Sequence, residues 1–106
     1  MNLTNQHWDE SGELSDEVLN RIGERFRALG EPSRLKLVRA LLVRERSVGE
    51  LVEITRLSQA NTSRHLQTLT NAGILGRRRE GRGVLYSIAD RTIPGLCSLV
   101  CESVVN

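Results

Sequence analysis

Two helix-start signals that stand close together constrain this chain more than any other feature. Ser47 precedes a short apolar segment and has Glu50 three residues later, a pairing in which each side chain caps the other's backbone N–H. Ser58 precedes a second segment of helical periodicity and is itself a favoured helix N-cap. The sequence therefore predicts a short helix over residues 48–56, a tight turn, and a longer helix over residues 59–72.

The segments on either side of this pair predict the remaining elements. Helical spacing of apolar residues predicts a helix that starts at Ser15 and ends at Gly30, and a second helix that starts at Pro32. After Gly73 the period changes to that of two short strands joined by a basic hairpin, and an apolar stripe over residues 93–104 predicts a last helix. This order predicts a mainly α fold with a small β-hairpin, namely a winged helix-turn-helix of about five helices and a two-stranded wing.

Size and composition limit the class of protein. The chain has 106 residues, 39% of them apolar, which is typical of one globular domain: we expect residues 1–14 to form a flexible arm and residues 15–106 the domain. No signal peptide and no membrane-spanning run are expected, and two cysteines are too few for a disulfide scaffold. We therefore expect a cytoplasmic protein, and its small core favours burial of further apolar surface in a homodimer.

Positive charge is concentrated in the middle and late parts of the chain. Residues 58–91 hold six Arg against two acids, whereas residues 1–32 hold three Arg against seven acids. Arg is the better bidentate partner for phosphate and guanine, although an excess of Arg over Lys also fits a GC-rich genome. In a helix-turn-helix the second helix enters the major groove of duplex DNA, and a neighbouring basic hairpin reaches phosphates or the minor groove.

The residues expected to contact double-stranded DNA carry short or planar hydrogen-bonding groups or a guanidinium. On the second helix and its cap they are Ser58, Gln59, Asn61, Thr62, Ser63, Arg64, His65 and Gln67. On the hairpin they are Arg77, Arg78, Arg79 and Arg82. Either set alone would more often be a solvated surface. A winged-helix module that binds protein instead of DNA stays open as an alternative. A thiol enzyme is not expected, because no base is paired with the cysteines.

Several stretches resemble one known family in their order along the chain. They are ALGEPSRL (28–35), SQANTSRHL (58–66), AGIL (72–75), RRREGR (77–82) and YSI (86–88). Together they resemble the ArsR/SmtB family of bacterial metalloregulatory repressors over about residues 15–105. The resemblance implies a winged-helix homodimer whose first and last helices form the interface. It also implies a repressor that leaves a twofold-symmetric operator when an inducer binds.

The metal ligands usual in that family are missing from their expected positions. Arsenic and cadmium sensors of the family carry Cys-x-Cys in the third helix, where residues 48–53 here read VGELVE. Zinc sensors carry Asp and His pairs on the last helix. Here Asp90 remains, but Thr92, Ser103 and Asn106 stand where His or an acid is expected.

Cys97 and Cys101 are the remaining candidates for sensing an inducer. They lie four residues apart in the predicted last helix, so they share one face, and thiolates are the natural ligands of soft metals. The family's sites imply three thiolates for arsenite, so a further donor would have to come from elsewhere, such as a partner subunit. Arsenite or a soft divalent metal ion, thiol redox or persulfide sensing, and a plain structural role all remain open.

Overall fold

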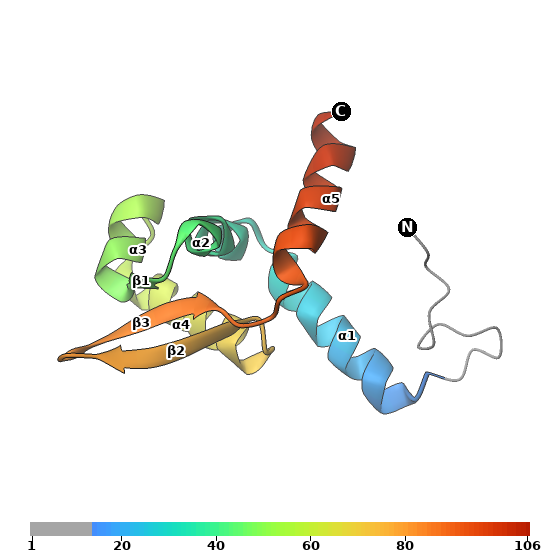
Figure 1. Cartoon of the computed structure of the whole chain (residues 1–106), viewed down its shortest axis with the longest axis horizontal. Helices are drawn as coiled ribbons and strands as arrows, with labels where there is room; N and C mark the ends of the chain where they lie inside the picture. Colours follow the sequence, from blue (N-terminus) through green and yellow to red (C-terminus); the bar gives the residue numbers. More distant parts are fainter. Residues whose placement is uncertain (1–13) are drawn as a thin grey trace.

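The computed structural model describes residues 14–106, which form five helices and a three-stranded antiparallel sheet (Figure 1). The elements are α1 (Asp16–Leu29), α2 (Pro32–Val43), β1 (Arg46–Ser47), α3 (Val48–Thr55), α4 (Gln59–Asn71), β2 (Leu75–Glu80), β3 (Gly83–Ile88) and α5 (Ile93–Val105). The predicted mainly helical winged helix-turn-helix is confirmed. The predicted arm, residues 1–14, lies outside the described residues except for Leu14. None of the helices described here has the length and apolar character needed to cross a bilayer.

Local capping explains where the helices begin. The Ser47 hydroxyl accepts a hydrogen bond from the backbone N–H of Glu50 (3.2 Å), and the Glu50 carboxylate accepts one from the N–H of Ser47 (3.0 Å). The hydroxyls of Ser15 and Ser58 cap α1 and α4 in the same way. Each cap satisfies a backbone N–H that has no partner inside its helix. The predicted starts of α1, α3 and α4 are therefore confirmed.

The predicted two-stranded wing is present as the hairpin of β2 and β3, and the sheet holds one strand more than predicted. The short strand β1 pairs with β3, with Arg46 opposite Tyr86, and makes a third strand in the order β1-β3-β2. Arg77, Arg78 and Arg79 of the predicted basic hairpin belong to β2, whereas Arg82 lies in the turn over residues 80–83, where Gly81 has a φ of +59°. Sequence periodicity did not place these arginines in a strand because an exposed arginine-rich strand shows no alternation of apolar residues.

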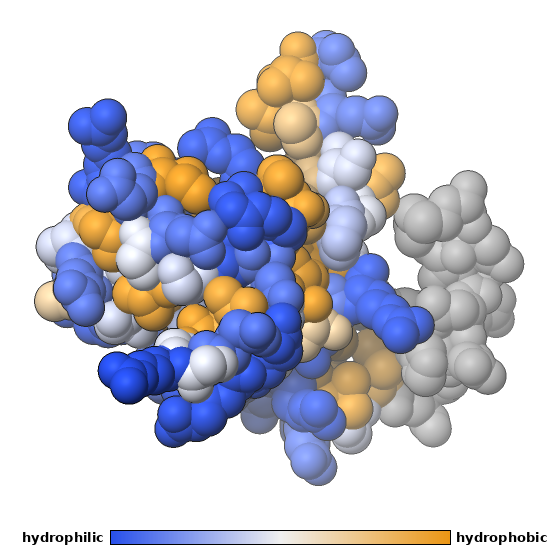
Figure 2. Space-filling model, turned by 60° about the vertical axis from the view of Figure 1, so that its left-hand side comes forward, coloured by the Kyte–Doolittle hydropathy of each residue, from blue (hydrophilic) through white to orange (hydrophobic). Residues whose placement is uncertain are grey.

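The core lies where α2, α3 and α4 meet the sheet. Its fully buried side chains include Leu37, Leu51, Leu66, Leu69, Ile74 and Ile93. Ile54 on α3 lies outside this core, because it is 46% exposed. The apolar stripes of α1 and α5 are largely uncovered: Phe26 is 58% exposed and Val104 is 78% exposed. Helix α5 stands away from the body (Figure 1), and Figure 2 shows apolar side chains along it.

Candidate nucleic-acid interface

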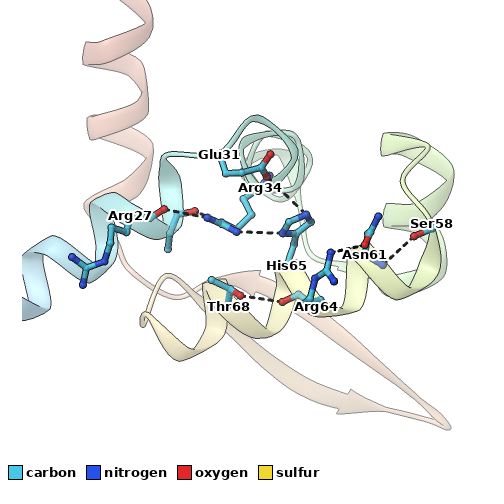
Figure 3. Close-up of polar contacts among 9 residues, drawn as sticks. Arg27, Glu31, Arg34, Ser58, Asn61, Arg64, His65 and Thr68 are labelled. Atoms are coloured by element: carbon cyan, nitrogen blue, oxygen red, sulfur yellow. Dashed lines mark hydrogen bonds and ion pairs between the residues drawn. The ribbon is translucent and has the colours of Figure 1, made fainter.

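The outward face of α4 carries polar side chains that are held in place by one another. Arg64 donates a hydrogen bond to the Asn61 side chain (2.6 Å), as Figure 3 shows, and Gln67 donates one to Asn71 (2.8 Å). These four side chains are exposed, as are the predicted contact residues Ser58, Gln59 and Ser63. The N-terminal end of a helix attracts anions, so this face suits a phosphate-bearing duplex.

Thr62 was expected on this face, but the structure turns it inward. Its side chain is fully buried, and its hydroxyl has no hydrogen-bond partner within residues 14–106. The reason is helical spacing: Thr62 is four residues before Leu66, which is buried on the same face. The prediction that the Thr62 side chain contacts DNA is therefore wrong.

His65 is also turned away from the outward face. Its side chain is 15% exposed, with Nε2 3.9 Å from a Glu31 carboxylate oxygen and Nδ1 3.4 Å from the guanidinium of Arg34 (Figure 3). Arg34 in turn donates to the backbone carbonyls of Ala28 (2.6 Å) and Arg27 (3.2 Å). His65 therefore lies against the junction of α1 and α2, where it positions α4, and we withdraw the expectation that it faces DNA.

The pKa of Glu31, at the same junction of α1 and α2, is lowered. Burial would raise the pKa of Glu31, but the backbone N–H groups of Ser33 and Arg34 and the nearby charges of His65 and Arg34 lower it overall. The carboxylate is thus kept ionised at the start of α2, where it accepts the N–H of Arg34 (3.1 Å) as the helix cap. This cap was not anticipated, because Pro32 alone marked the helix start.

The arginines of the wing divide into two groups. Successive side chains of a strand point to opposite faces, so Arg77 and Arg79 share one face of β2 and Arg78 lies on the other. Arg78 pairs with Glu45 (2.6 Å) and with Glu80, and these hydrogen bonds raise its pKa and lower that of Glu45.

Three wing arginines remain available for a partner. No side-chain hydrogen bond or ion pair within the described part of the chain engages Arg77, Arg79 or Arg82, and all three are exposed. Of the four predicted wing contacts, Arg78 alone has its charge balanced by acids among residues 14–106.

A long-range ion pair that sequence reasoning missed ties α1 to the end of α4 and the start of α5. Arg25 donates to the Asp90 carboxylate (2.5 Å) and to the backbone carbonyl of Ala72 (3.2 Å). Asp90, only 8% exposed, also accepts hydrogen bonds from the N–H and hydroxyl of Thr92. Burial opposes ionisation of Asp90, but the Thr92 hydrogen bonds and the Arg25 charge lower its pKa overall.

The two cysteines lie on α5, away from the polar face of α4. Both are free thiols, Cys97 half-buried and Cys101 exposed, and burial raises the pKa of Cys97. They line a groove of about 380 Å³ between α5 and the ends of α1 and α2. Among residues 14–106, no group of three or more His, Cys, Asp or Glu side chains is placed to hold a metal ion. Within these described residues the site therefore offers two thiols and no grouped third donor.

The fold and the polar face beside a basic wing define a winged helix-turn-helix protein. The family model described as "Bacterial regulatory protein, arsR family" matches residues 31–76. The chain is 33% identical over 101 residues to a "Transcriptional repressor SmtB homolog" of Synechocystis, covering 91% of this chain and 76% of that protein. The chain therefore belongs to the ArsR family, and the resemblance seen in the sequence is confirmed.

Other relatives support the same assignment. The HTH-type transcriptional repressor SmtB of Mycobacterium tuberculosis is 42% identical over 90 residues, or 85% of this chain. A probable mercury resistance operon repressor of Streptomyces lividans is 40% identical over 74 residues, or 70% of this chain. The matches span 64% and 59%, respectively, of the lengths of these two relatives.

Solved structures share the architecture. A crystal structure of M. tuberculosis Rv0081 matches with a TM-score of 0.76 and 33% identity, covering 85% of this chain and 91% of that one. A solution structure described as the homodimeric winged helix-turn-helix DNA-binding domain of M. bovis Mb0332 matches with a TM-score of 0.79 and 29% identity, covering 85% and 86%.

Proposed function

We propose that this protein is a transcriptional repressor that binds duplex operator DNA in the cytoplasm. The observation that carries the proposal is the outward face of α4, whose exposed polar side chains lie beside a wing with three arginines that have no acidic partner in the described residues. In this model Gln59, Ser63 and Arg64 reach base edges in the major groove, and Arg79 and Arg82 contact flanking phosphates. The relatives described as repressors support this function.

The uncovered apolar stripes of α1 and α5 support a homodimer. Phe26 on α1, and Val100 and Val104 on α5, are all more than half exposed, and such contiguous apolar surface on a small domain favours burial by a partner. A second copy covering both helices would place two copies of α4 on successive major grooves of a twofold-symmetric operator. The homodimeric description of the M. bovis domain supports this arrangement.

We further propose that Cys97 and Cys101 form the inducer site. Their shared helix face, outside the DNA surface, supports sensing of arsenite or of a soft metal ion, with any additional donor supplied by the partner subunit. Thiol oxidation or persulfide formation is the alternative chemistry of the same pair. A disulfide between them within one regular helix would be strained, so oxidation would favour a bond across the dimer.

Fluorescence anisotropy on duplexes from upstream of the protein's own gene tests the repressor function. We expect salt-dependent binding with a log–log slope of roughly −7 if a dimer neutralises about eight phosphates. Arg64→Ala should cost about 1–3 kcal/mol of operator affinity, and Arg79→Ala should reduce the salt slope by about 2 per dimer. Arg39→Ala is the matched control, because Arg39 lies on α2 beside α5.

The outcomes separate the two classes of function. Unchanged affinity in both the Arg64 and the Arg79 variants would refute the docking model. Absence of duplex binding, on this DNA and on a random-sequence library, would favour the protein-interaction module. Sedimentation of Val104→Glu beside the unaltered chain tests the dimer, which this change should disrupt.

A further inference from the structure

We propose that Arg64 recognises a guanine in the major groove and that Asn61 is its positioning residue, which holds the guanidinium in place and does not itself read adenine. The inference rests on the proposed binding of operator DNA and deepens it, because it names a base that each half-site must contain. The observation behind it is the hydrogen bond from Arg64 Nη2 to the Asn61 amide oxygen Oδ1 (2.6 Å), which Figure 3 shows beside the Ser58 cap.

Both side chains lie near the N-terminal end of α4, the part of a recognition helix that meets base edges. The Ser58 hydroxyl accepts the backbone N–H of Asn61 (3.1 Å), so the helix cap fixes where Asn61 stands. Asn61 and Arg64 are three residues apart, a spacing that makes two side chains neighbours on a helix surface. Both are exposed. The pair therefore belongs to the surface of α4 that is proposed to enter the DNA.

The charge of Arg64 determines which way the Asn61 amide is turned. A guanidinium carries five N–H donors and no acceptor, so only the oxygen of the amide can face it. A hydrogen bond from a charged donor is roughly twice as strong as one between neutral groups. An asparagine that reads adenine uses this same oxygen for adenine N6 and its amide nitrogen for N7. Adenine would have to compete with Arg64 for the oxygen, which argues against Asn61 as an adenine reader.

Arg64 keeps a complete recognition edge while Asn61 holds it. A guanidinium has one edge made by Nη1 and Nη2 and another made by Nε and Nη2, each with a pair of parallel N–H groups. Nη2 contributes one N–H to each edge, and the bond to Asn61 uses only one of them, so the other edge stays whole. Two parallel donors match O6 and N7 of guanine, the commonest specific contact of arginine in the major groove.

An amide holds an arginine without cancelling its charge. Arg78 of the wing is held by the carboxylates of Glu45 and Glu80, which balance its charge. Arg64 has no acid within ion-pair distance among residues 14–106, so its full charge is left for DNA. Immobilising a long side chain on binding costs the equivalent of about three- to tenfold in affinity. Asn61 removes much of this cost before the DNA arrives.

Selection of half-sites from a randomised duplex library, followed by anisotropy on single-base variants, tests the inference on the whole chain. We expect a position where guanine is preferred over adenine, and Arg64→Ala should abolish that preference. Asn61→Ala should reduce it about three- to tenfold, although this change raises helix propensity and should not weaken α4. Asn61→Asp should keep the preference, because a carboxylate also accepts from Arg64, while its charge weakens binding to every duplex.

Two comparisons separate positioning from direct readout. Asn20→Ala is the matched control, because it makes the same substitution at an exposed asparagine of a different helix, α1, and should leave the guanine preference unchanged. In the Arg64→Ala background, Asn61→Ala should have no further effect on base preference. A positioning residue acts only through the side chain that it holds, so the two changes should not add.

The contrary results differ in what they refute. Loss of an adenine preference in both Asn61 variants, with the guanine preference unaffected, would overturn the inference and make Asn61 a direct reader of adenine. Duplex binding without a guanine preference that depends on Arg64 would also overturn it and would leave the repressor proposal intact. A chain that binds no duplex at all would refute the repressor proposal and, with it, the guanine contact.

Discussion

Replacing Thr62 by Val tests the finding that this side chain belongs to the core and not to the DNA surface. Val has nearly the shape of Thr but lacks the hydroxyl, and the Thr62 hydroxyl is fully buried without a partner in the described residues. A buried polar group without a hydrogen bond costs about 1–3 kcal/mol of desolvation. The two residues have similar helix propensities, so the change should not weaken α4 itself. We therefore expect Thr62→Val to raise the free energy of unfolding by about 1 kcal/mol.

Thermal denaturation followed by circular dichroism, at a fixed protein concentration, measures this effect. A gain of 1 kcal/mol should raise the melting temperature by roughly 4–8 °C for a domain of this size, and operator affinity should stay unchanged.

Thr55→Val is the matched control, because the buried Thr55 hydroxyl donates to the Leu51 carbonyl (2.7 Å) and accepts from the N–H of Leu57 (3.4 Å). That change should destabilise the protein by about 1 kcal/mol. A less stable Thr62→Val, or one that loses about tenfold in operator affinity, would refute the assignment of Thr62 to the core.

Three further predictions follow from contacts outside the α4 core. Glu45→Gln removes an acid that balances Arg78, so binding to DNA at low salt should tighten by about threefold and become more salt-dependent, as anisotropy would show. Gly73→Ala should destabilise the protein by more than Gly81→Ala in urea titrations. Both residues have a positive φ, which costs about 1–2 kcal/mol for Ala, but of the two only Gly73 has a side chain, that of Arg25, within 2.9 Å of the added Cβ. Because the pKa of Asp90 is lower in the folded protein, its ionised carboxylate stabilises the fold above the unfolded-state pKa of about 4, and this contribution is lost as pH falls through the lower folded-state value. Asp90→Asn should therefore show a shallower loss of stability in acid. An unchanged pH profile would contradict the role of the ion pair.

Much of the fold followed from signals that act over a few residues. The capping box of Ser47 and Glu50 and the cap at Ser58 depend only on groups within one turn, so their consequences could be read from the sequence. The same holds for Gly73, which ends α4 with a positive φ of +81°. The outward residues of α4 followed from helical spacing, and that spacing, applied more strictly, would also have placed Thr62 inward beside Leu66.

The contacts that distinguish this protein depended on residues far apart in the chain. Nothing near Arg25 in sequence indicates that it meets Asp90, and nothing near Arg78 indicates that Glu45 removes it from the basic surface. Apolar residues recur with the same helical spacing on a face that packs on the core and on a face that stays uncovered. The sequence therefore could not distinguish the exposed Phe26 from a core residue. By itself the sequence determined which helices form, where they start and the family to which the chain belongs, because capping and periodicity are local. Only the tertiary structure decided which arginines are available to DNA and what surrounds the two thiols, because pairing and burial depend on which distant elements approach one another.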